Sequence, residues 1–166
     1  MEKEPHQLAE EGKHAFAAGR YAEAARLFTE ASQGYTLAGD RLHAAEMDNN
    51  RSVALLQDRH PDQALEAAAG TDKLFESLAD PKRQAMALGN QAAALEELGR
   101  QAEAIAFYQQ ASALLQPTGE TEMRSIILKR ISSLKMRSGK ALESLAAMDS
   151  ALSIEKPASP KEKLLK

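Results

Sequence analysis

Apolar residues recur along most of this chain at intervals of three and four positions, the spacing of a helix with one buried face. The run Leu88, Ala92, Leu95 shows this spacing, and Ala104, Tyr108 and others continue it. No segment alternates apolar and polar residues as a half-buried strand would, so a β-sheet is not expected. The pattern predicts helices at about 5–18, 21–38, 41–58, 61–79, 81–98, 101–115, 119–138 and 141–154.

Prolines and glycines mark the ends of these helices. Pro61 and Pro81 stand where a first helical turn would begin, a position at which proline sacrifices no hydrogen bond. Asp80 precedes Pro81 and is expected to cap the N-terminus of that helix. Glycines that could end a helix in the left-handed conformation follow three of the expected helices, at positions 19, 99 and 139.

Small residues recur with a fixed period. Ala24, Ala64, Ala104 and Ser144 are each separated by 40 residues, which identifies four copies of one unit. Each unit contains two of the expected helices, and a small residue would let the two helices approach closely. We therefore predict one domain over residues 1–155, with repeats near 5–38, 41–79, 81–115 and 119–154, followed at 156–166 by a linker or the start of a truncated capping helix.

Composition narrows the functional class. The 166 residues are 43% hydrophobic but only 4% aromatic, they include no cysteine, and their net charge is −3. Disulfides and thiolate metal sites are thereby excluded, and a basic nucleic-acid-binding domain is not expected. There is no glycine-rich phosphate loop with its lysine, no His-Glu-x-x-His motif and no membrane-length apolar run. We expect a cytoplasmic protein that is not an enzyme, with no catalytic, cofactor or metal site.

The repeat resembles the tetratricopeptide repeat (TPR) family. The first repeat matches the family motif at Gly12, Gly19, Tyr21, Ala24, Phe28 and Ala31, and the third at Ala92, Gly99, Gln101, Ala104, Tyr108 and Ala111. The family's usual period is about 34 residues, so the chain looks like a subtype with a 40-residue period. The resemblance implies an all-α, right-handed superhelix (solenoid) of four antiparallel helical hairpins, whose first helices line a concave groove that holds a peptide or a partner helix.

In that groove the resemblance places twelve candidate partner-binding residues: Glu46, Asn49, Asn50, Val53, Met86, Asn90, Ala93, Glu97, Lys129, Arg130, Ser133 and Arg137. Asn50 and Asn90 are one period apart, and their carboxamides could pair with a ligand backbone; alternatively, they bond a neighbouring helix and fix the stacking. The cations between Arg124 and Lys140 could select an acidic ligand segment, or could form a solvated helix face.

The functional prediction is a protein-protein interaction scaffold or adaptor that binds a protein or peptide and neither nucleic acid nor membrane. Two alternatives stay open. The chain could be a self-assembling architectural module that forms homo-oligomers through its terminal repeats, or it could be the docking arm of a larger multidomain protein.

Overall fold

The computed structural model describes residues 4–155, and every regular element in that range is helical. The predicted all-α fold is therefore confirmed. In chain order the elements are α1 (Pro5–Ala17), α2 (Tyr21–Leu37), α3 (Arg41–Gln57), α4 (Pro61–Ala68), α5 (Thr71–Ser77), α6 (Pro81–Glu97), α7 (Gln101–Leu115), the 3-10 turn η1 (Gln116–Thr118), α8 (Thr121–Arg137) and α9 (Ala141–Glu155).

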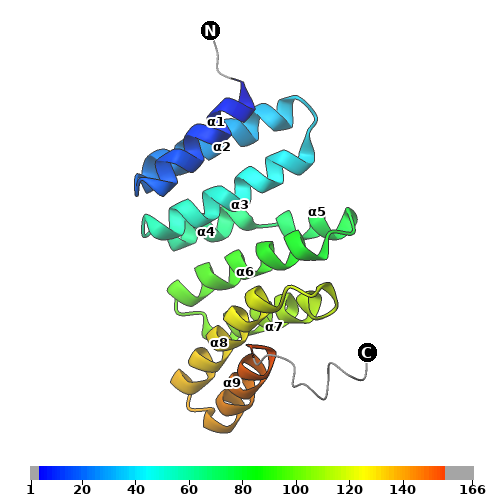
Figure 1. Cartoon of the computed structure of the whole chain (residues 1–166). Coiled ribbons are helices and arrows are strands. Elements are labelled where there is room, and N and C mark those ends of the chain that lie inside the picture. Colours follow the sequence, from blue (N-terminus) through cyan, green and yellow to red (C-terminus); the bar gives the residue numbers. More distant parts are fainter. Residues whose placement is uncertain (1–3, 156–166) are drawn as a thin grey trace.

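The helices form a stack of hairpins, with α1 and α2 at one end and α8 and α9 at the other (Figure 1). Within the hairpins, α1 packs on α2, α3 on α4, α6 on α7 and α8 on α9. Successive hairpins meet through α2 and α3, through α4 and α6, and through α7 and α8. The second helices begin at residues 21, 61, 101 and 141, so the structure keeps the 40-residue period of the sequence.

The prediction of one continuous helix over residues 61–79 was wrong. The helix stops at Ala68 and a new one starts at Thr71, because Ala69 is extended and Gly70 has a φ of 79°. Thr71 and Asp72 are both buried after this break. Thr71 Oγ1 donates a hydrogen bond to the Ala68 carbonyl oxygen at 2.8 Å, which satisfies one of the carbonyls left free at the end of α4.

The short turns between the paired helices are confirmed, although the turn of the second repeat has no glycine. Gly19, Gly99 and Gly139 all have φ near 75°, a conformation that glycine adopts without steric cost. Arg59 occupies the same position in the second repeat with a φ of 65°. The turn geometry is therefore set by the repeat itself, even where the residue type is unfavourable.

Close contact between paired helices depends on small residues, as predicted. Ala24, Ala64 and Ala104 have no exposed surface, and Ser144 is buried. In the second hairpin Ser52 Oγ donates to the Ala64 carbonyl oxygen at 2.7 Å. In the fourth, Ser132 Oγ donates to the Ser144 carbonyl oxygen at 2.9 Å. The helices of a pair are thus near enough for a side-chain hydroxyl to reach the opposite backbone.

Among the described residues, no helix is both long and apolar enough to cross a membrane. The same residues contain no group of three or more histidine, aspartate or glutamate side chains placed to hold a metal ion. The predicted linker or capping segment at 156–166 lies outside the described residues.

Candidate functional site

Two adjoining pockets lie along the first helices of the first three hairpins, and together we call them the inner groove. One pocket of about 210 Å³ is lined by Lys13, Phe16, Phe28, Asn50 and Val53. The other, of about 220 Å³, is lined by Lys13, Glu46, Met47, Asn49, Asn50, Phe75, Arg83 and Met86. Because Lys13 and Asn50 belong to both linings, the two pockets form one continuous surface.

The three candidate asparagines have different roles in the structure. Asn49 is buried, and its Oδ1 accepts hydrogen bonds from Thr71 Oγ1 at 3.2 Å and from Asn90 Nδ2 at 3.4 Å. Asn49 and Asn90 therefore join α3 to α5 and α6, and they fix the stacking of two hairpins. Asn50 is half-buried on the wall shared by both pockets, where its carboxamide faces the groove.

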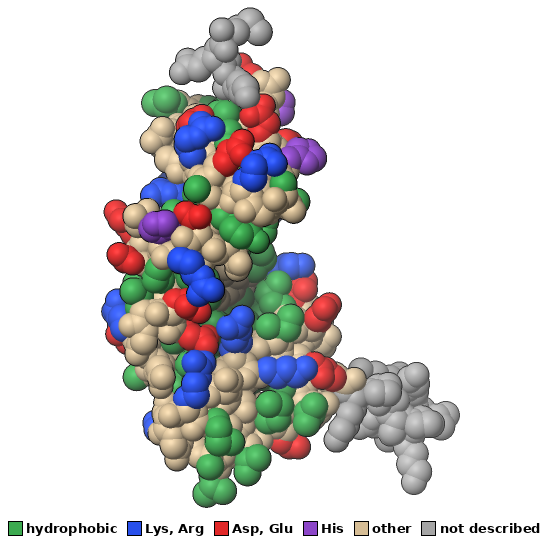
Figure 2. Space-filling view, turned by 90° about the vertical axis from the view of Figure 1, so that its left-hand side faces the viewer, with side chains coloured by type: hydrophobic (Ala, Val, Ile, Leu, Met, Phe, Trp, Pro, Cys, Tyr) green, Lys and Arg blue, Asp and Glu red, His purple; other side chains and the backbone are tan. Residues whose placement is uncertain are grey.

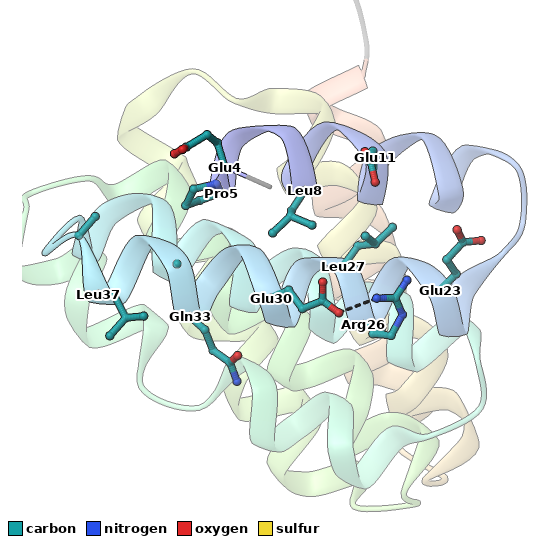
Figure 3. Close-up of a pocket in the computed structure, with 12 residues that line it drawn as sticks. Glu4, Pro5, Leu8, Glu11, Glu23, Arg26, Leu27, Glu30, Gln33 and Leu37 are labelled. Atoms are coloured by element: carbon teal, nitrogen blue, oxygen red, sulfur yellow. Dashed lines mark hydrogen bonds and ion pairs between the residues drawn. The ribbon is translucent and has the colours of Figure 1, made fainter. Parts of the chain in front are cut away.

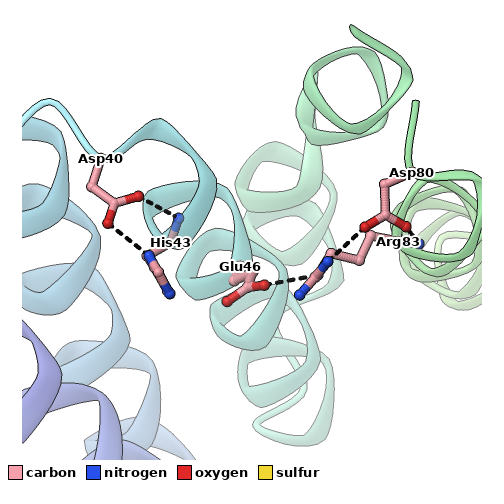
Figure 4. A network of polar contacts seen from close by, with 5 residues as sticks. All are labelled: Asp40, His43, Glu46, Asp80 and Arg83. Carbon is pink, nitrogen blue, oxygen red and sulfur yellow. Dashed lines mark hydrogen bonds and ion pairs between the residues drawn. The ribbon is translucent and has the colours of Figure 1, made fainter. Parts of the chain in front are cut away.

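Arg83 at the rim of the groove connects two hairpins (Figure 4). Its Nε lies 2.8 Å from Glu46 Oε1 on α3, and its Nη1 lies 2.6 Å from Asp80 Oδ2. The backbone N–H of Arg83 also donates to Asp80 Oδ1 at 2.9 Å, which confirms Asp80 as the N-cap of α6. This backbone hydrogen bond is the largest cause that lowers the pKa of Asp80, and the Arg83 side chain adds to it. The bonds of Asp80 in turn raise the pKa of Arg83.

Asp80→Ala is expected to cost about 1 kcal/mol, because it removes the N-cap of α6. Folding lowers the pKa of the Asp80 carboxyl. Its contribution to folding stability is therefore fully present above the pKa that Asp80 has in the unfolded chain, and it is lost as the pH falls through the pKa that Asp80 has in the folded protein. Urea unfolding at pH 7 and at pH 3 should show a smaller loss of stability on acidification in D80A than in the wild type. Asp62→Ala, in the first turn of α4, serves as the control. Equal unfolding free energies for D80A and the wild type would contradict the cap.

The predicted basic residues of α8 are paired within the protein. Arg137 Nη2 lies 2.5 Å from Glu96 Oε1, and Arg130 Nη1 lies 3.5 Å from Glu96 Oε2. Lys129 Nζ contacts Glu155 Oε1 on α9 at 2.6 Å. Tyr108 lies beside Glu96, and burial, with help from that carboxylate, raises the pKa of Tyr108 to about 12. These cations balance internal carboxylates and do not line the inner groove.

The remaining predicted residues divide between the groove and the rest of the surface. Val53 lines the first pocket, and Met86 lines the second with 45% of its surface exposed. Ala93, Glu97 and Ser133 line neither pocket. The structure therefore brings together Glu46, Asn49, Asn50, Val53 and Met86, and adds Asn90 through its bond to Asn49.

Sequence reasoning missed the residues of the first hairpin and of α5. Lys13, Phe16 and Phe28 form most of the first pocket, and Phe75 closes the second. The period contained part of the signal, because Lys13 lies 40 residues before Val53 in the same position of the repeat. Phe75 gave no such signal, since it reaches the groove only after the break at Gly70.

Comparison with known proteins supports the fold. No protein-family model matches the sequence, and no curated protein matches it. Solved structures do match. BtubC (BKLC) from P. vanneervenii aligns with a TM-score of 0.83 and 17% identity over 96% of this chain and 69% of that one. A Podosopora anserina protein assigned as a kinesin light chain, with nearly identical TPR-like repeats, aligns with a TM-score of 0.78 and 15% identity over 98% of this chain and 82% of that one. The fold is that of a TPR-like solenoid.

A third solved structure, MamA AMB-1, matches this TPR-like chain with a TM-score of 0.52 and 18% identity over 98% of this chain and 97% of that one. At these identities the comparison establishes the fold alone. The predicted superhelix of hairpins is confirmed, whereas membership of a 40-residue-period subtype stays a prediction.

Proposed function

We propose that this chain is a non-catalytic interaction scaffold that binds an extended peptide segment of another protein in the inner groove. TPR-like repeats suggest protein partners in general, and the groove supports a more specific proposal. The observation that carries it is the position of Asn50, a half-buried carboxamide on the wall between two small pockets. Ligand sites commonly combine apolar walls with a few well-placed polar groups of this kind.

The two pockets fit an extended backbone with alternating side chains. In an extended peptide, side chains two positions apart point the same way and lie about 7 Å apart. Two apolar side chains of this kind could enter the two pockets, one against Phe16 and Phe28 and the other against Met47 and Phe75. The Asn50 carboxamide offers a donor and an acceptor to the peptide unit between them.

Lys13 suggests an acidic residue beside the apolar ones. It lines both pockets, and its ammonium group lies 2.7 Å from Glu10 Oε1 while 55% of the side chain stays exposed. An exposed pair of this kind is weak, so a ligand carboxylate could replace Glu10 at small cost. We assign the acidic ligand segment predicted from the sequence to Lys13 and not to the cations of α8, because Lys13 lines both pockets and those cations line neither.

The test is a selection from a library of random peptides on the immobilised full chain, followed by affinity measurements on the selected peptides. Peptides selected by the wild type should carry apolar side chains at alternate positions. They should bind Val53→Glu at least about tenfold more weakly, because a carboxylate would enter an apolar pocket. Ser133→Glu is the matched control: it occupies the same repeat position, 80 residues later, and lines neither pocket.

Two results would reject the groove as the site: equal affinity of the selected peptides for V53E and the wild type, or a loss of affinity in S133E as large as in V53E. A docking arm of a larger protein would use the same groove, and that alternative stays a prediction. Cytoplasmic localisation also stays a prediction.

A further inference from the structure

The first hairpin has a wide groove between α1 and α2, which we call the N-terminal groove (Figure 3). It encloses about 840 Å³ and is lined by Glu4, Pro5, Leu8, Glu11, Glu23, Arg26, Leu27, Glu30, Gln33, Gly34, Leu37 and Ala38. Leu8 and Leu27 point from the two helices toward the space between them (Figure 3). The groove is separate from the inner groove, since no residue belongs to both linings.

The last hairpin has a surface equivalent to the N-terminal groove. A smaller pocket of about 390 Å³ lies on the last hairpin, and six of its lining residues are Leu128, Ile131, Glu143, Ala146, Ala147 and Ser150. Each of them stands 120 residues, or three periods, after a residue of the N-terminal groove, namely Leu8, Glu11, Glu23, Arg26, Leu27 and Glu30. The two surfaces are therefore equivalent parts of two repeats.

In the last hairpin this surface is covered by the preceding helix. The rest of the smaller pocket is formed by Lys135 of α8 and by Gln109, Ser112, Ala113 and Gln116, which belong to α7 and the turn after it. The N-terminal groove has the same construction and about twice the volume, and its lining includes no residue from outside the first hairpin. Its construction fits a second helix placed as α7 is placed against the last hairpin.

The opposite end of the stack presents such a helix. Leu145, Met148 and Leu152 of α9 stand 40 residues after Ile105, Tyr108 and Ser112 of α7. Tyr108 and Ser112 are buried, whereas Leu145 and Leu152 are 60% and 45% exposed. At 100° per residue, these α9 side chains lie opposite Ala146, Ala147 and Ser150, which face α7. Figure 2 shows hydrophobic side chains gathered at the lower end of the molecule, where α8 and α9 lie.

We propose that α9 of one copy occupies the N-terminal groove of a second copy, so that chains stack head to tail and continue the solenoid. The occupant is assigned from the repeat itself, which makes this contact internally, between α7 and the last hairpin. Such a contact is heterologous, so assembly is open-ended unless it closes into a ring.

The first measurement is the mass of the full chain by sedimentation equilibrium from about 1 μM to about 1 mM, a range that spans weak and moderate association. The mass should rise with concentration in steps of 18.0 kDa. Leu145→Glu should weaken association at least about tenfold, because it sets a carboxylate against a groove that contains four glutamates. Leu142→Glu is the matched control: Leu142 is 84% exposed on α9, and its equivalents Ala22, Asp62 and Ala102 are also exposed.

A mixing experiment establishes the head-to-tail geometry. Leu8→Arg blocks the N-terminal groove, where the surrounding glutamates can accommodate the cation, and leaves α9 intact. L8R and L145E should each be monomeric, and an equimolar mixture should form a complex of two chains and nothing larger. Circular dichroism checks that both variants fold.

Three outcomes would overturn the proposal. The first is a wild-type chain that stays monomeric at every concentration. The second is self-association of L8R as strong as that of the wild type, which is expected if two copies join through the same face. The third is an equal effect of L142E and L145E on association. The wild-type mass does not depend on any variant folding. Failure of head-to-tail stacking would leave the peptide-binding proposal unaffected, because the two grooves share no residue.

Discussion

Phe75→Ala is expected to reduce the free energy of unfolding by about 3–5 kcal/mol, the range for removal of a fully buried phenylalanine ring. Phe75 has no exposed surface and packs with Ala45 of α3 and Ala87 of α6. It lies on α5, which is only seven residues long. A helix of two turns has little stability of its own, so α5 depends on this contact.

Urea unfolding followed by circular dichroism would measure the loss. Leu37→Ala is the control, because Leu37 is 90% exposed and its replacement should change the stability by no more than about 0.5 kcal/mol. Phe75 also closes one pocket of the inner groove, so peptides selected by the wild type should bind F75A more weakly. A change in stability below about 1 kcal/mol would mean that α5 is held by other contacts.

Ala104→Leu is expected to destabilise the protein by about 1–3 kcal/mol or more, since extra methyl groups in a tightly packed contact force the surroundings to move. Ala104 has no exposed surface and lies in α7, where that helix packs on α6. The equivalent contact in the second hairpin leaves a hydroxyl of α3 only 2.7 Å from a carbonyl oxygen of α4. A leucine at this position would have to separate the paired helices.

The matched control for that substitution is Ala106→Leu, two residues along the same helix. Ala106 is exposed, and leucine is nearly as good a helix former as alanine, so the change should be close to neutral. Both variants can be compared by thermal and urea unfolding. Similar stabilities for A104L and A106L would show that the small residues of the 40-residue period are not needed for close packing.

The sequence by itself determined the helices, except the one at 61–79, together with their pairing and the turns between them. These features depend on local chemistry: the helical spacing of apolar residues, proline in the first turn of α4 and α6, and Asp80 as the cap of α6. The period also located the small residues between paired helices, because Ala24 and its equivalents had to be buried against their partners for hairpins to form. The resemblance to TPR proteins placed Asn50 in the predicted groove, and Asn50 lines both pockets.

The tertiary structure alone decided the details in which one repeat differs from another. The helix predicted at 61–79 breaks at Ala69 and Gly70, and the break lets Thr71 reach Asn49 of α3 and lets Asp72 accept a hydrogen bond from Gln91 Nε2 of α6 at 3.0 Å. Both partners are about 20 residues away in the sequence, so the local pattern could not contain these contacts. The cations of α8 looked available in the sequence, yet Glu96 lies 41 residues before Arg137 and pairs with it. Which polar groups remain open to a ligand depends on such distant partners, since each is brought into reach only by the stacking of the hairpins.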